Sequence, residues 1–180
     1  MIICLSKMLL KGLGLEENIF DQNFNGECTV LRLIHYPPTL KPILPNQLRC
    51  GEHSDYGALT ILFQDPAGGL EIKTRQDEWL PAPYIPNTVI INIGDCMEMW
   101  TNGFLKSTPH RVVNPQIEKM GMPRYSTAFF FDPNLDCELK CFKKFEEVND
   151  TKFTSKTYRN HVFKIFDETY PESNHFKEKI

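Results

Sequence analysis

The chain has 180 residues and a mass of 20.9 kDa, the size of one ordinary folded domain. Hydrophobic residues make up 41% and charged residues 24% of it, which excludes disordered and fibrous proteins. Twenty lysines and arginines against 23 aspartates and glutamates leave a net charge of −3, which argues against binding of nucleic acid through bulk positive charge. No apolar run approaches the span of a bilayer, so we expect a soluble protein that does not bind membranes.

Residues 1–26 are expected to form a helical N-terminal segment that packs on the rest of the chain. Leucines recur at every fourth residue from Leu5 to Leu13, and Gly14 follows as a stop signal. Residues 15–24 would form a second short helix or a turn. Lys7 interrupts the apolar start and no small-residue cleavage site follows, so a helix is a better interpretation than a secretory signal.

The middle zone, residues 27–135, consists of short runs rich in Val, Ile, Thr and Phe, separated by Pro, Gly and Asn. This spacing predicts a mainly β protein, a sandwich or a barrel with flanking helices. Asn102-Gly103 between two runs predicts a tight hairpin, because such turns require a positive φ. The expected strands are 29–36, 58–63, 70–73, 88–93, 97–101, 107–113 and 125–131.

Residues 136–180 are expected to form a C-terminal helical extension. Its helix would begin near Thr154 and end before Pro171, with Tyr158, Val162 and Phe166 among the residues of one apolar face. The six cysteines of the chain form no C-x-x-C pair and are too sparse for a disulfide scaffold. They indicate a reduced protein of the cytoplasm.

Two histidines and one carboxylate form the first candidate site. In an extended segment, His53 and Asp55 point to the same face, and His110 lies 57 residues further on, at the end of another expected strand. Two imidazoles and one carboxylate that leave coordination positions open suit a non-haem Fe(II) centre that activates O₂. The alternative is a surface turn in which Asp55 caps the next residues and His110 packs beside Pro109.

A second cluster would bind a carboxylate. Arg124 and Ser126 share one face of a strand, so a guanidinium and a hydroxyl point the same way, and Tyr36 at the end of an earlier strand could add a phenolic donor. The alternative for Arg124 is a surface salt bridge, because exposed arginines are common.

Together these residues resemble the Fe(II)- and 2-oxoglutarate-dependent oxygenases of the isopenicillin N synthase-like group. The resemblance runs from about Leu9 to Pro133. The motifs that carry it are His53-x-Asp55, His110-Arg111-Val112-Val113, Arg124-x-Ser126, Leu31-Arg32-Leu33-Ile34-His35-Tyr36-Pro37-Pro38, Asn92-Ile93-Gly94-Asp95, Trp100-Thr101-Asn102-Gly103 and Phe129-Phe130-Phe131-Asp132-Pro133-Asn134.

The resemblance implies a double-stranded β-helix, or jelly roll, with Fe(II) held by His53, Asp55 and His110. It implies that 2-oxoglutarate chelates the iron and pairs its distal carboxylate with Arg124, with hydrogen bonds from Ser126 and Tyr36. Reaction with O₂ would yield succinate and CO₂ and oxidise a small organic substrate, most simply by hydroxylation. The family also leaves room for ascorbate as a reductant.

Two departures from the family pattern affect these expectations. Ile34 occupies a position where many relatives have an asparagine, which removes one polar contact near the cosubstrate. The chain also begins at what resembles an internal helix of the family, so the N-terminal part is expected to be missing. Sheet edges exposed in this way could pair with another copy and give an oligomer.

Three alternatives to the dioxygenase remain open from the sequence. The first is an oxidase of the isopenicillin N synthase or aminocyclopropane carboxylate oxidase type, which does not use 2-oxoglutarate. The second is a truncated, non-catalytic jelly-roll module. The third is a zinc hydrolase, which would leave Arg124 and Ser126 without a role.

Overall fold

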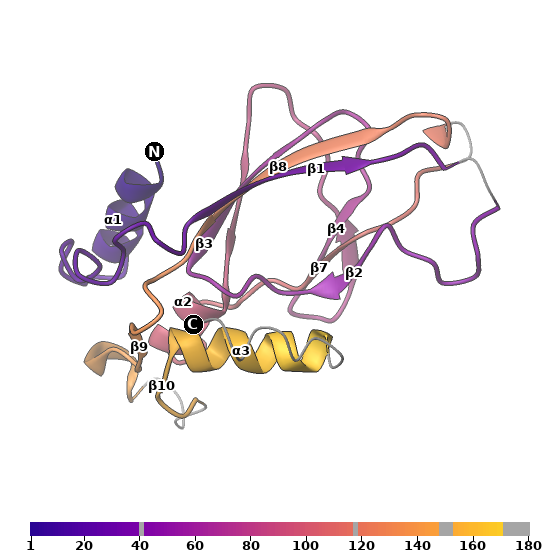
Figure 1. Cartoon of the computed structure of the whole chain (residues 1–180). Coiled ribbons are helices and arrows are strands. Elements are labelled where there is room, and N and C mark those ends of the chain that lie inside the picture. The colour runs from indigo at the N-terminus through magenta and orange to yellow at the C-terminus, as the bar shows by residue number, and fades with distance from the viewer. Residues whose placement is uncertain (40–41, 117–118, 148–152, 171–180) are drawn as a thin grey trace.

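The computed structural model describes residues 1–39, 42–116, 119–147 and 153–170. Two four-stranded antiparallel sheets face each other (Figure 1), as expected for a double-stranded β-helix. One sheet has the order β1 (Val30–Tyr36), β8 (Arg124–Phe131), β3 (Leu59–Gln64) and β6 (Ile90–Ile93). The other has the order β2 (Cys50–His53), β7 (His110–Val112), β4 (Leu70–Lys73) and β5 (Trp79–Pro81).

The helices gather at one end of the two sheets. Figure 1 shows α1 where β1 begins, and α3 running past α2. The hydrophobic core lies at this end and joins residues of all three helices to the sheets, among them Leu10, Trp100, Phe131 and Val162. The remaining elements are α1 (Ile2–Gly12), α2 (Asp95–Trp100), β9 (Glu138–Leu139), the 3-10 helix η2 (Lys143–Phe145), β10 (Lys156–Thr157) and α3 (Tyr158–Thr169).

Helix α2 corrects the prediction of a strand at residues 97–101. Gly94 caps the helix in an extended conformation, and Asp95 and Glu98 lie in the first turn, where the helix dipole favours acidic side chains. Asn102 and Gly103 do have positive φ values, 49° and 78°, as a hairpin would require. They instead end α2, because the Gly103 N–H donates to the Glu98 carbonyl at 2.8 Å, so the predicted hairpin is wrong.

The N-terminal segment contains one helix. Gly14 has a φ of 64° just after α1, as expected for a stop signal, and residues 15–24 form successive turns rather than a second helix. Phe20 is buried there and contacts the Trp100 ring at 4.9 Å between centroids. Among the described residues, no helix combines the length and the apolar character needed to cross a bilayer.

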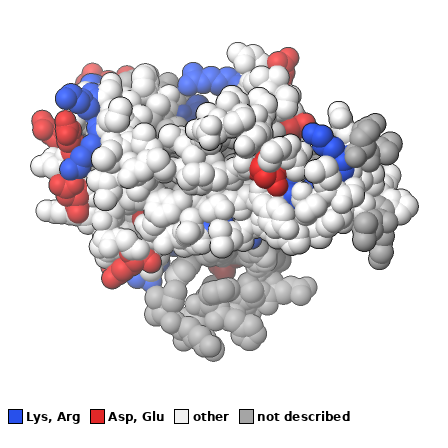
Figure 2. Space-filling view, turned by 90° about the horizontal axis from the view of Figure 1, so that it is seen from above, with Lys and Arg blue, Asp and Glu red and all other residues white. Residues whose placement is uncertain are grey.

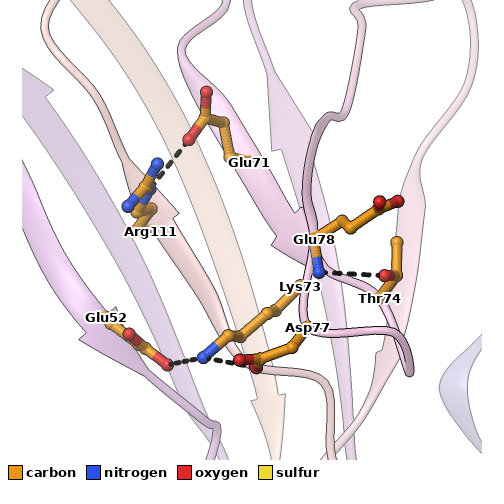
Figure 3. A network of polar contacts seen from close by, with 7 residues as sticks. All are labelled: Glu52, Glu71, Lys73, Thr74, Asp77, Glu78 and Arg111. Carbon is orange, nitrogen blue, oxygen red and sulfur yellow. Dashed lines mark hydrogen bonds and ion pairs between the residues drawn. The ribbon is translucent and has the colours of Figure 1, made fainter.

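A network of charged side chains covers the outer face of the second sheet (Figure 3). Lys73 on β4 pairs with Glu52 on β2 at 3.2 Å and with Asp77 at 2.8 Å, and Arg111 on β7 pairs with Glu71 on β4 at 2.7 Å. These contacts link three strands of the sheet from outside. Because side chains alternate along a strand, Arg111 on the outer face places its neighbour His110 on the inner face.

Candidate metal and carboxylate-binding site

The structure brings His53, Asp55 and His110 together. His53 ends β2 and His110 begins β7, and the two are register partners in this antiparallel pair, with ring centroids 4.3 Å apart. Asp55 follows in the loop after β2, and its Oδ1 lies 3.8 Å from His110 Nε2. One ligand atom from each of the three residues lies within 4.8 Å of the other two, and this is the metal-ligand cluster found among the described residues.

Hydrogen bonds to backbone carbonyls orient the two imidazoles. Nδ1 of His53 lies 2.8 Å from the Gly51 carbonyl, and Nδ1 of His110 lies 3.0 Å from the Thr108 carbonyl. A carbonyl only accepts, so Nδ1 carries the proton in each ring and Nε2 is left as the ligand atom. The donor set therefore fits a divalent metal ion that prefers two imidazoles and one carboxylate.

Without a metal ion, the imidazole of His53 holds a second proton, on Nε2, strongly. The contact with the Cys50 thiol, with Sγ 3.9 Å from Nδ1, and the Gly51 carbonyl raise the pKa of His53 to about 9, against the opposing effect of burial. Metal binding at this ring requires the loss of that proton from Nε2.

Two residues to which the sequence analysis gave no role fix the carboxylate. Asp55 Oδ2 accepts hydrogen bonds from Thr60 Oγ1 and Asn92 Nδ2, both at 2.6 Å, and this leaves Oδ1 for a metal. Thr60 is on β3 and Asn92 on β6, and they are direct register partners. Strand alternation could have placed both on the inner face, but nothing in the sequence indicated that they would meet Asp55.

The loop that carries Asp55 is held by the start of α2. The N–H of Asp95 donates to the Asp55 carbonyl at 2.8 Å, and the N–H of Cys96 donates to the Gly57 carbonyl at 3.0 Å. A Cβ on Gly94 would collide with the Gly57 and Asp55 carbonyl oxygens, so only glycine allows this approach.

The side chain of Asp95 adds a second link between this loop and the helices. Burial raises its pKa, but the neighbouring polar groups of His161, Ser107 and Ser54 outweigh burial and hold the pKa below the ordinary value. Ser54 lies between the metal ligands His53 and Asp55, and His161 is on α3, 3.3 Å from the Asp95 carboxylate. The helical end of the molecule is thus joined to the site.

Arg124, Ser126 and Tyr36 also meet, on the first sheet. Arg124 is the register partner of Tyr36, and its guanidinium lies over the Tyr36 ring, 4.8 Å from the centroid. Its Nη1 donates to Ser126 Oγ at 3.2 Å and its Nε donates to the Gly68 carbonyl at 2.8 Å. The surface salt bridge considered for Arg124 is wrong: the residue is only 1% exposed, and within the described chain no carboxylate pairs with it.

The two clusters line one cavity of about 430 Å³ between the sheets. Apolar side chains, Ile34 among them, line the same cavity. Burial raises the pKa of the Tyr36 hydroxyl, against the opposing charge of Arg124, so the phenol keeps its proton and can donate it in a hydrogen bond. A buried guanidinium without an anionic partner is costly, which indicates that an anion from outside the chain belongs beside Arg124.

Comparisons with known proteins agree with this geometry. The family model described as "2OG-Fe(II) oxygenase superfamily" matches residues 26–133. The 2-oxoglutarate-dependent dioxygenase htyE of Aspergillus rugulosus is 36% identical over 157 residues, which are 81% of this chain and 47% of that protein. Gibberellin 2-beta-dioxygenase 8 of Arabidopsis thaliana is 34% identical over 169 residues, 93% of this chain and 45% of that protein.

A solved structure has the same fold. The crystal structure of a full-length Neurospora crassa protein in complex with alpha-KG superposes with a TM-score of 0.83 at 35% identity. The match covers 92% of this chain and 52% of the Neurospora protein. The chain therefore spans about half the length of the relatives that it matches.

Proposed function

Because the chain belongs to the 2OG-Fe(II) oxygenase superfamily, we propose that it is the catalytic part of a non-haem Fe(II)- and 2-oxoglutarate-dependent dioxygenase. It would oxidise a small organic substrate, by hydroxylation, with release of succinate and CO₂. Residues 27–135 would form the catalytic domain, residues 1–26 would pack on it, and residues 136–180 would form a C-terminal helical extension. Within the superfamily, the ordered motifs of the chain favour the isopenicillin N synthase-like group.

The observation that supports this proposal most directly is the buried Arg124, which has no carboxylate partner among the described residues and lines the same cavity as the three-ligand cluster. A metal site alone would fit a hydrolase as well. A buried guanidinium at the far end of the cavity adds a site for a second carboxylate, which a hydrolase does not need and 2-oxoglutarate supplies.

In this function His53, Asp55 and His110 would hold Fe(II). When bound, the metal would supply the activation of O₂ that is coupled to oxidative decarboxylation of the cosubstrate. Thr60 and Asn92 keep the Asp55 carboxylate in place for the metal.

The other residues of the cavity would bind the cosubstrate and exclude water. Arg124 and Ser126 would bind the distal carboxylate of 2-oxoglutarate, and the protonated Tyr36 hydroxyl would donate a further hydrogen bond to it. The apolar side chains between the two clusters, Leu62, Ile72, Ile90 and Val112 among them, keep the reacting atoms away from bulk water.

The anaerobic absorbance spectrum of the Fe(II)-loaded chain, with and without 2-oxoglutarate, tests the proposal. We expect a weak visible charge-transfer band only when metal and cosubstrate are both present. A folded chain that gives no band would contradict the proposed function. Succinate formed in step with O₂ uptake would then separate the dioxygenase from an oxidase that does not use 2-oxoglutarate.

The six cysteines, all described and all free of disulfides, support a reducing compartment such as the cytoplasm for this enzyme.

A further inference from the structure

Arg32 is a second cationic residue that faces the cavity, on the edge strand β1. Alternation along β1 places it on the same face as Ile34 and Tyr36, and it lines the cavity with them. Its register partner on β8 is Ala128, whose small side chain leaves space beside Arg32 on the cavity face of the sheet. Unlike Arg124, Arg32 is exposed, so its guanidinium lies toward the mouth of the cavity.

Within the described chain, no hydrogen bond or ion pair engages the Arg32 guanidinium. The other arginines near it have partners: Arg49 donates to the Pro37 carbonyl at 3.3 Å and to Thr39 Oγ1 at 3.2 Å, and Arg124 is held as described above. Among the described residues that line the cavity, the one acid is Asp55. Its carboxylate already accepts hydrogen bonds from Thr60 and Asn92 and belongs to the metal-ligand cluster.

The proposed cofactors leave the charge of Arg32 unbalanced. The two positive charges of Fe(II) and the charge of Arg124 are balanced by Asp55 and by the two carboxylates of 2-oxoglutarate. Arg32 and Arg49 are the remaining cations of the lining, and the Arg49 guanidinium already donates to a carbonyl and a hydroxyl. Arg32 is then a cation beside a mainly apolar space, and a further anion would be stabilised there.

The position of Arg32 suits a substrate group rather than the cosubstrate. Along β1 it is four residues from Tyr36, which is about 13 Å at the rise of a β-strand. It is two residues, or about 7 Å, from Val30. Val30 pairs with Phe130 on β8, and Phe130 pairs in turn with Thr60 on β3, which contacts Asp55. Val30 therefore lies at the level of Asp55 along the sheet. Arg32 is therefore closer to the level of the metal cluster than to the end where Arg124 would bind 2-oxoglutarate.

We propose that Arg32 determines substrate specificity by binding a carboxylate of the substrate. The substrate is then a small organic acid with a mainly apolar body. This inference rests on the proposed function and names its substrate class. The body of the acid would lie against Ile34, Leu62, Ile90 and Phe130, which line the same cavity. Its C–H bonds would then lie toward the metal cluster.

Calorimetric titration of the anaerobic chain, loaded with Fe(II) and 2-oxoglutarate, tests this inference. The probes are butanoate, hexanoate, octanoate and 3-phenylpropanoate, each compared with its uncharged primary amide. The proteins are the wild type, Arg32→Met, Arg32→Lys and the control Arg75→Met, whose arginine is exposed in the turn between β4 and β5. The affinity of each protein for 2-oxoglutarate is measured separately from the charge-transfer band.

We expect the wild type and Arg75→Met to bind at least one acid roughly tenfold more tightly than its amide. Arg32→Met should lose this preference and keep its affinity for 2-oxoglutarate, and Arg32→Lys should recover part of the preference. The inference is overturned if the wild type prefers the acid in none of the acid–amide pairs, or if the preference survives in Arg32→Met. It is also overturned if Arg32→Met loses affinity for 2-oxoglutarate as strongly as it loses affinity for the acid. Failure of the proposed function would show separately, as the absence of the band in the wild type.

Discussion

The two oxygens of the Asp55 carboxylate have different tasks, and this makes Asn92 important although it binds no metal. Asp55 Oδ2 accepts from Asn92 and Thr60, and Oδ1 faces His110. We expect Asn92→Leu to weaken Fe(II) affinity about 10- to 100-fold, because the carboxylate loses a fixed orientation. Metal competition with a chelator measures this, with Asn18→Leu, which is exposed in the N-terminal turns, as the control. An unchanged affinity in Asn92→Leu would contradict the role.

Arg124 should affect the cosubstrate and not the metal. Replacement of His53 or Asp55 with Ala should abolish iron retention, because two ligands do not hold the ion in competition with water. Arg124→Met should retain iron and weaken 2-oxoglutarate binding by roughly 2–5 kcal/mol, because the distal carboxylate loses a buried charged partner. Iron content after dialysis and the cosubstrate titration give the two readouts. Equal loss of iron in all three variants would refute the assignment of roles.

Asp132 should make the stability of the fold depend on pH. Burial, opposed by the Tyr158 hydrogen bond, raises its pKa to about 6, above the ordinary value of 3.8. The folded state therefore holds this proton more tightly than the unfolded state, and stability falls as the pH rises through this window. Between pH 4 and pH 7.5 we expect a loss of about 2 kcal/mol that Asp132→Asn does not show. Urea unfolding of both proteins at the two pH values measures it, and a constant difference between them would contradict the prediction.

At the residue scale, the sequence predicted which candidate residues lie together better than it predicted the contacts that hold them in place. Strand alternation, applied to the spacing of the two histidines and the aspartate and to that of the arginine and serine, predicts which of these side chains share a face. Thr60 and Asn92 were missed because their partner, Asp55, lies in a loop whose path depends on tertiary contacts with α2. The burial of Arg124 was also not predictable, since a local pattern does not show what covers a side chain.

Among the elements, α2 shows where local patterns fail. The apolar residues 96, 97, 99 and 100 fit a short buried strand or a single buried helical turn, and periodicity does not separate the two over so few residues. The acidic residues at 95 and 98 were the available signal for a helix. Strands β2 and β5 were missed for a related reason: each has four residues or fewer and is held mainly by its neighbours in the sheet.

The contact between α2 and the Asp55 loop can be tested through Gly94. A methyl group at this position would collide with backbone oxygens of Gly57 and Asp55, which have little freedom to move. We expect Gly94→Ala to lower both the free energy of unfolding and the Fe(II) affinity, because α2 and the loop must separate. Gly121→Ala is the control, since its Cβ would meet no atom within 4 Å. If both variants bound metal like the wild type, the loop would not depend on α2.

On the scale of the whole molecule, the outer face of the first sheet is unusually apolar. Leu31 and Leu33 on β1 are 60% and 77% exposed, and Tyr125 on β8 and Ile91 on β6 are also exposed. Figure 2, seen from the side of β1 and β8, shows few charged side chains at the centre of the molecule and most of them at its margins. Among the described strands, β1 is in addition an edge strand of its sheet, and such an edge can pair with another chain.

This chain should therefore self-associate as its concentration rises. We expect sedimentation velocity to show species larger than 20.9 kDa at micromolar concentrations. The double variant Leu31→Thr and Leu33→Lys should shift the distribution toward the monomer, because a charge on the face and the loss of two apolar side chains make pairing unfavourable. Leu44→Lys, also exposed but outside the two sheets, is the matched control and should leave association unchanged. A wild-type chain that stays monomeric over this range would show that the exposed face does not drive self-association.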